Sequence, residues 1–99
     1  MKVIIVGAGA TGTQLANHLI QEGHIVSIIE SNEESARHAS NRLDCLVIQD
    51  SGNNIEALKE AGISDADALI CVTESDEDNM IICSLAASLF PEGKLSRDD

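Results

Sequence analysis

The chain has 99 residues and a formal net charge of −11, because seventeen acidic side chains face only six lysines and arginines. This length allows one domain at most, and a hydrophobic content of 43% is too high for a disordered chain. An acidic chain is repelled by phosphate backbones and anionic bilayers, and a single aromatic residue, Phe90, gives bases nothing to stack on. Composition therefore disfavours a nucleic-acid-binding protein.

Cysteine usage and hydropathy give no sign of a metal site or a membrane segment. Cys45, Cys71 and Cys83 form no C-x-x-C pair, so we expect buried, unreactive thiols and neither a zinc site nor a disulfide framework. No signal peptide precedes the first apolar run, and no apolar run approaches the ~20 residues that span a bilayer. We expect a cytoplasmic location.

The first thirty residues alternate between strand and helix patterns. Residues 2–6 form an apolar run that is typical of a parallel strand buried on both faces. Residues 10–22 carry apolar side chains at helical spacing, and Gly23 follows where a left-handed C-cap is expected. Residues 25–29 predict a second strand, which ends at Glu30.

A glycine turn joins the first strand to the first helix, with the sequence Gly7-Ala8-Gly9-Ala10-Thr11-Gly12. In a dinucleotide-binding fingerprint the first glycine permits the tight turn, the second lets the backbone approach a phosphate, and the third allows close helix packing. The phosphate lies at the helix N-terminus, and an acid about twenty residues further on binds ribose hydroxyls, which is the position of Glu30. The alternative is that the glycines serve only the turn.

The rest of the chain repeats the alternation. Ser31 with Glu34 resembles a capping box and predicts a helix over 33–43, and Asn53 with Glu56 predicts a cap for a helix that Gly62 ends. Strands are predicted over 45–48 and 68–72, and a fourth helix from Ser75 to about Leu89. The pattern predicts an α/β fold, a Rossmann-type doubly wound parallel sheet in the order 3-2-1-4.

The domain is expected to cover residues 1–91, and residues 92–99 to form a polar tail or an incomplete fifth strand. Without a complete fifth strand, the fourth would lie at an exposed edge of the sheet. The apolar residues of the fourth helix, over 80–90, exceed what one buried face needs, and they favour self-association.

Polar residues follow the other strands as well. Asp50 and Ser51 come after the third strand, and Thr73 and Glu74 after the fourth. Ligands in such sheets bind beyond the carboxyl ends of the strands, so we expect these residues to converge with the glycine turn. Asp50 would bind adenine or ribose, and Thr73 the phosphates or second ribose. The alternative for Asp50 and Ser51 is turn and helix-capping chemistry.

Catalytic groups are not evident. A dehydrogenase needs a proton donor or acceptor near the nicotinamide, but His18, His24 and His38 are expected at the surface or away from the strand ends. The acidic run that begins at Glu74 fits a solvated first helical turn better than a cation site.

The chain resembles the nucleotide-binding lobe of the regulator-of-potassium-conductance (RCK or KTN) domains, over about residues 2–91. The resemblance rests on the glycine turn, on Leu58-Lys59-Glu60-Ala61-Gly62-Ile63, on Ala66-Asp67-Ala68-Leu69-Ile70, and on Val72-Thr73-Glu74-Ser75-Asp76-Glu77-Asp78-Asn79-Met80. The last run is the most distinctive. The sequence departs from the family at Thr11, where an aliphatic residue is usual, and it stops where a fifth strand begins.

This resemblance implies regulation and not catalysis. Such domains bind NAD(H) or ATP/ADP and assemble as homodimers or larger rings beneath a membrane-embedded potassium channel or transporter. By position, the glycine turn from Gly7 to Gly12 would hold phosphates and Glu30 the ribose. Asp50 and Ser51 would contact the adenosine end, and Thr73 and Glu74 the far side of the ligand.

Two other functions stay open at this point: the cofactor half of an NAD-dependent dehydrogenase, and a nucleotide-binding module without a transporter partner. Glu30 disfavours a 2′-phosphate and so favours NAD(H) over NADP(H), but it does not separate NAD(H) from ATP or ADP.

Overall fold

The computed structural model describes residues 1–52, 54–73 and 94–97. In chain order the elements are β1 (Lys2–Val6), α1 (Ala10–Gln21), β2 (Ile25–Glu30), α2 (Glu33–Arg42), β3 (Leu46–Gln49), α3 (Ile55–Glu60), the 3-10 turn η1 (Ile63–Asp65), β4 (Ala68–Cys71) and β5 (Lys94–Arg97). The helix predicted to begin at Ser75 lies outside the described residues.

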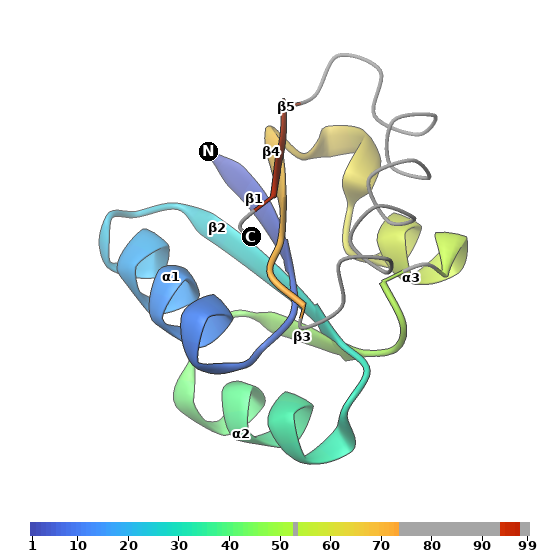
Figure 1. Ribbon diagram of the computed structural model, residues 1–99. Helices are drawn as coiled ribbons and strands as arrows, with labels where there is room; N and C mark the ends of the chain where they lie inside the picture. Colours follow the sequence, from blue (N-terminus) through green and yellow to red (C-terminus); the bar gives the residue numbers. More distant parts are fainter. Residues whose placement is uncertain (53, 74–93, 98–99) are drawn as a thin grey trace.

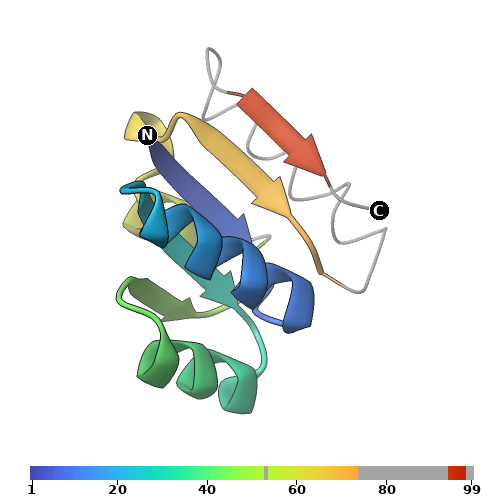
Figure 2. The ribbon, with the colours of Figure 1, turned by 90° about the vertical axis from the view of Figure 1, so that its left-hand side faces the viewer.

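The strands form one sheet in the order β3-β2-β1-β4-β5, and every neighbouring pair is parallel. Helices α1 and α2 cover one face of the sheet and α3 the other (Figures 1 and 2). The predicted α/β fold and the strand order 3-2-1-4 are confirmed. The carboxyl ends of the strands therefore meet along one edge of the sheet, as a dinucleotide-binding fold requires.

The core consists of two apolar layers, because successive residues of a strand point to opposite faces. Val3 and Ile5 of β1 pack toward α1 and α2, where they meet Ala16 and Ala39. The alternate residues of β1 pack on the other face with α3 and η1, in a cluster of Ile4, Val6, Ile29, Ile48, Ala57, Leu58, Ala61, Ile63, Ala66, Leu69 and Cys71. The near-continuous apolar run of β1 follows from this burial on both faces.

The segment Lys94–Arg97 adds a strand to the far side of β4. It pairs in parallel with β4 in a register that sets Ala68 opposite Lys94 and Cys71 opposite Arg97. Of the two alternatives expected for the C-terminal residues, the described segment forms the strand, so β4 is not the exposed edge that was expected without one. The main-chain donors and acceptors on this side of β4, which would make an exposed edge prone to pairing, are therefore used within the sheet.

The N-cap residues of two helices each lie one residue after the predicted cap. Helix α2 is capped by Asn32, whose side chain accepts a hydrogen bond from the backbone N–H of Ser35, and not by Ser31. Helix α3 is capped by Asn54, whose side-chain oxygen accepts from the N–H of Glu56. Asn53, the predicted cap of α3, lies outside the described residues.

Two glycines follow helices in left-handed conformations: the sequence predicts this conformation for Gly23, and for Gly62 it predicts the end of the helix. Gly23 follows α1 with a φ of +88°, and Gly62 follows α3 with a φ of +89°. A residue with a side chain is disfavoured at such φ values, so these positions stop each helix sharply. None of the helices within the described residues is long and apolar enough to cross a membrane.

Candidate functional site

The four strand ends predicted to converge are tied together by backbone hydrogen bonds. The N–H of Gly7, just after β1, donates to the carbonyl of Ile29 in β2 at 2.8 Å. The N–H of Val72, just after β4, donates to the carbonyl of Val6 at 2.8 Å, and that of Asp50, after β3, donates to the carbonyl of Glu30 at 3.0 Å. The carboxyl edge is therefore continuous from β3 to β4, with the glycine turn at its centre.

Gly7 and Gly12 are required by the protein itself. Gly7 has a φ of +112°, and an added Cβ would lie 3.0 Å from both the carbonyl carbon and the oxygen of Val72. A Cβ on Gly12 would collide with the carbonyl oxygen of Gly7 and lie 3.1 Å from the Val72 side chain. These close contacts allow the tight turn after β1 and pack the start of α1 against the turn and the residues that follow β4. Such packing is the structural role expected of the first and third glycines.

Gly9 differs from both, because the protein gives no reason for a glycine there. Its φ of −73° suits any residue, and an added Cβ would meet no heavy atom of the described residues within 4 Å. Gly9 is also exposed, at the N-terminus of α1. A position where only a ligand would meet the missing Cβ is the arrangement expected of the second fingerprint glycine, which lets a phosphate approach the backbone.

The carboxylate of Glu30 lies beside the glycine turn and accepts two backbone hydrogen bonds. One oxygen accepts from the N–H of Ala8 at 2.6 Å, and the other accepts from the N–H of Asn32 at 2.8 Å. The side chain is half-buried at the end of β2. The structure therefore places this acid next to the turn, where the fingerprint puts the ribose-binding acid.

Asp50 is engaged in local turn chemistry. One carboxylate oxygen accepts from the N–H of Ser51 at 2.6 Å, and the other accepts from the side-chain amide of Asn54 at 3.0 Å. Because Asn54 in turn caps α3, these contacts match the alternative interpretation of Asp50 as a turn and capping residue. Asp50 and Ser51 nevertheless lie at the same edge as Glu30.

The remaining predicted site residues lie around the turn. Ala10 and Thr11 are exposed in the first turn of α1 and Thr73 is half-buried two residues after β4. Glu74 lies outside the described residues. The structure thus brings together the glycine turn, Glu30 and the residues that follow β3 and β4.

A hollow of about 380 Å³ opens at the glycine turn and runs between α1 and α2. Its lining residues are Ala8, Gly9, Ala10, Thr13, Gln14, Ser35, His38, Ala39 and Arg42. In a chain with seventeen acids, this lining holds an arginine and a histidine but no carboxylate. Such a wall is compatible with a negatively charged ligand.

Sequence reasoning missed the α2 side of this hollow. Ser35, His38 and Arg42 are spaced by three and four residues and so lie on one face of a helix, and this periodicity was the available signal. His38 is exposed but borders the glycine turn, whereas His18 is exposed on α1 and pairs with Glu22 at 2.8 Å.

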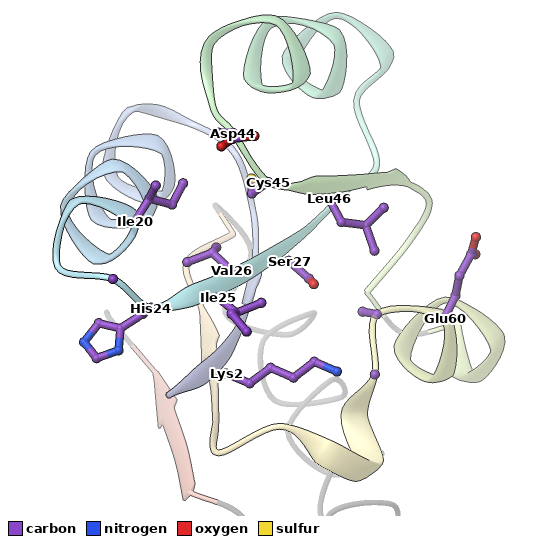
Figure 3. Close-up of a pocket in the computed structure, with 13 residues that line it drawn as sticks. Lys2, Ile20, His24, Ile25, Val26, Ser27, Asp44, Cys45, Leu46 and Glu60 are labelled. Carbon is purple, nitrogen blue, oxygen red and sulfur yellow. The ribbon is translucent and has the colours of Figure 1, made fainter.

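A second hollow, of about 520 Å³, lies at the opposite, amino end of β2 and β3 (Figure 3). Ile25 and Leu46 are exposed beside it, at 65% and 51%, and none of the predicted site residues lines it. Partial burial raises the pKa of the Cys45 thiol in its wall, and the nearby carboxylate of Asp44 raises it further. The thiol is therefore less reactive than a free one at neutral pH, in agreement with an unreactive role.

The described part of the chain shows no cluster of three or more histidine, cysteine or acidic side chains that could hold a metal ion. Within the same residues, Cys45 and Cys71 form no disulfide. The convergent groups are backbone N–H donors and a carboxylate, which suit binding of a phosphorylated ligand with hydroxyl groups.

Comparison with protein families now identifies the chain. The TrkA-N domain family matches residues 3–96. The chain belongs to the TrkA-N domain family. Among curated relatives, the Trk system potassium uptake protein TrkA of Halomonas elongata is 41% identical over 90 residues, which cover 91% of this chain but 20% of that protein. The chain thus spans about a fifth of the length of this TrkA-N relative.

Solved structures share the TrkA-N fold described above. The Kef CTD of Shewanella denitrificans in its AMP-bound form superposes with a TM-score of 0.84 at 23% identity, covering 98% of this chain and 58% of that one. The GsuK channel bound to NAD superposes with a TM-score of 0.83 at 20% identity, covering 99% of this chain and 18% of that one. At these identities the likeness concerns the fold.

Proposed function

We propose that this TrkA-N domain is a regulatory, nucleotide-sensing unit that controls potassium transport. The observation that carries the proposal is Gly9: none of the described residues requires a glycine there, and the hollow between α1 and α2 opens beside it. In a TrkA-N sequence, a glycine that the described residues do not require, at a helix N-terminus, is best explained by a nucleotide ligand.

The proposed ligand is an adenine nucleotide, either NAD(H) or ATP/ADP. Backbone N–H groups of the turn, from Gly9 to Gly12, would hold its phosphates, because the N–H groups of Gly7 and Ala8 already donate to the Ile29 carbonyl and the Glu30 carboxylate. Glu30 would accept hydrogen bonds from the ribose hydroxyls. Asp50 and Ser51 lie where the adenosine end would be, and Thr73 and Glu74 follow β4 toward the other end. The AMP and NAD in the two structural neighbours support this ligand class.

The proposed mechanism is sensing by differential affinity. A ligand shifts a protein between two shapes only if it binds one of them more tightly. The glycine turn is hydrogen-bonded to β2, and the Glu30 side chain at the end of β2 is hydrogen-bonded to Asn32, the N-cap of α2. A ligand that shifts the turn would therefore also shift the start of α2. The shape change would pass to a membrane-embedded potassium transporter or channel, on the cytoplasmic side, through a homodimer or larger ring.

Sensing without turnover is favoured over an oxidoreductase function. The predicted site residues that the structure describes at the carboxyl edge include two carboxylates, Glu30 and Asp50, and both already accept two hydrogen bonds from the protein. His18 is exposed in the last turn of α1, and the exposed His38 of α2 lines the hollow between the two helices. Steady hydride transfer from NADH to any substrate of a dehydrogenase panel would contradict the regulatory proposal.

Potassium uptake in the host cell tests this function. Cells that lack the gene should show altered rubidium or potassium uptake, and the wild-type chain should restore it. The variant Gly9→Ala should not restore uptake, because its added methyl group occupies the phosphate position, whereas Gln21→Ala, a control at the far end of α1, should restore it fully. Uptake that does not depend on the chain would instead indicate a nucleotide-binding module without a transporter partner.

A further inference from the structure

The carboxylate of Glu30 joins two backbone segments that are far apart in sequence. Oε1 accepts from the N–H of Ala8, in the middle of the glycine turn, across a sequence separation of 22 residues, and Oε2 accepts from the N–H of Asn32. These contacts are made by the protein alone. Their donor–acceptor distances, 2.6 and 2.8 Å, lie in the range of strong, charge-assisted hydrogen bonds.

A carboxylate has about four lone-pair sites, two on each oxygen. Each oxygen of Glu30 uses one of them for a backbone donor, so one remains on each oxygen. Two neighbouring acceptor sites match the two neighbouring hydroxyls of a ribose. The contacts to the protein and to a ribose are therefore compatible.

The turn and α2 are connected through this side chain. Asn32 not only donates its N–H to Glu30 but also caps α2, because its side-chain oxygen accepts from the N–H of Ser35 at 2.9 Å. On the other side, Ala8 is buried, and its carbonyl accepts from the Thr13 hydroxyl at 3.1 Å. The conformation of the glycine turn is therefore held from both α1 and α2.

We propose that Glu30 is a positioning residue that holds the glycine turn in its phosphate-binding conformation before any ligand arrives. This inference rests on the proposed function, because it presumes that the turn binds phosphate. It goes beyond ribose recognition: Glu30 contributes to binding of phosphate ligands that have no ribose. A turn that is already ordered loses less conformational entropy on binding, and the ligand is held correspondingly more tightly.

Inorganic pyrophosphate separates positioning from ribose contact, since it has phosphates and no hydroxyl groups on a sugar. Titration calorimetry of pyrophosphate and of AMP would be performed on the wild type, on Glu30→Gln and on Glu34→Gln. Glu34 lies exposed in the first turn of α2. Its substitution removes the same charge near the site, and so it controls for reduced repulsion of an anion.

We expect Glu30→Gln to bind pyrophosphate roughly tenfold more weakly than Glu34→Gln, because a side-chain amide accepts through one oxygen and loses one of the two charge-assisted bonds. Hydrogen exchange of the Ala8 amide should be faster in ligand-free Glu30→Gln than in the control. Equal pyrophosphate affinity in the two variants, or an unchanged Ala8 exchange rate, would overturn the proposal.

Failure of the proposed function would look different, since the wild type itself would then bind neither AMP nor pyrophosphate. If Glu30→Gln does not fold, Glu30→Asp replaces it in the same titration. That variant keeps the charge but is one methylene too short to reach both donors. Wild-type pyrophosphate affinity in Glu30→Asp would equally overturn the positioning role.

Discussion

Replacing Gly9 by alanine separates folding from ligand binding at this site. The φ of −73° accommodates alanine, and the added Cβ meets nothing within 4 Å. Stability should therefore stay within about 0.5 kcal/mol of the wild type or rise by about 0.4–1 kcal/mol, since alanine restricts the unfolded chain. A phosphate displaced by the methyl group would lose at least one charge-assisted hydrogen bond, worth about 1.5–3 kcal/mol, so affinity should fall at least about tenfold.

The assay combines urea denaturation with calorimetric titration of AMP and NAD. One other glycine, Gly23, provides a control with the opposite pattern, and Gly12 tests the packing of the turn. Gly23→Ala should cost about 1–2 kcal/mol because of its φ of +88°, yet leave affinity unchanged, since Gly23 lies at the far end of α1. Gly12→Ala should destabilise the fold through its collision with the Gly7 carbonyl. Unchanged nucleotide affinity in a folded Gly9→Ala variant would refute the phosphate-approach reasoning.

Three further substitutions test the fold and the hollow. Asn32→Ala should lower the free energy of unfolding by about 1 kcal/mol through loss of the α2 cap, whereas Ser31→Ala should change it little, and equal effects in urea denaturation would contradict the assigned cap. Leu58→Ala should cost about 2–5 kcal/mol, because the side chain is fully buried, and a cost below 1 kcal/mol would argue against this core. Arg42 lines the hollow, so Arg42→Gln should weaken binding of ATP more than that of AMP, whereas Arg37, which lies near Glu33, is the control, and Arg37→Gln should weaken neither. If the two variants behave alike in calorimetry, Arg42 does not contact the ligand.

The strands and the glycine turn could be predicted because they depend on local patterns, and the strand order followed from the dinucleotide-binding fold that these patterns indicate. The apolar run of β1 indicated burial on both faces, and the run from Gly7 to Gly12 marked the turn. The structure also distinguishes glycines that the sequence treats alike: Gly7 and Gly12 are required by packing, and Gly9 is not.

What could not be predicted depends on pairing in space. Lys94–Arg97 carries one apolar residue, so its sequence left a polar tail and an incomplete strand as alternatives, and only its parallel pairing with β4 decides between them. The hydrogen bond from Ala8 to Glu30 arises because β1 and β2 are adjacent and in register, with Val6 opposite Ile29. The shift of the α2 cap from Ser31 to Asn32 depends on local chain geometry within one residue, which patterns do not resolve.

Calorimetric titration of the wild-type chain with NADH, NAD, ATP, ADP and AMP tests the central claim most directly. We expect at least one of them to bind at a single site per chain, and the others to displace it in proportion to their own affinities. The same titration of Gly9→Ala should give markedly weaker binding. If none of the five nucleotides binds the folded chain, the glycine turn serves only the fold and the nucleotide-sensing function is wrong.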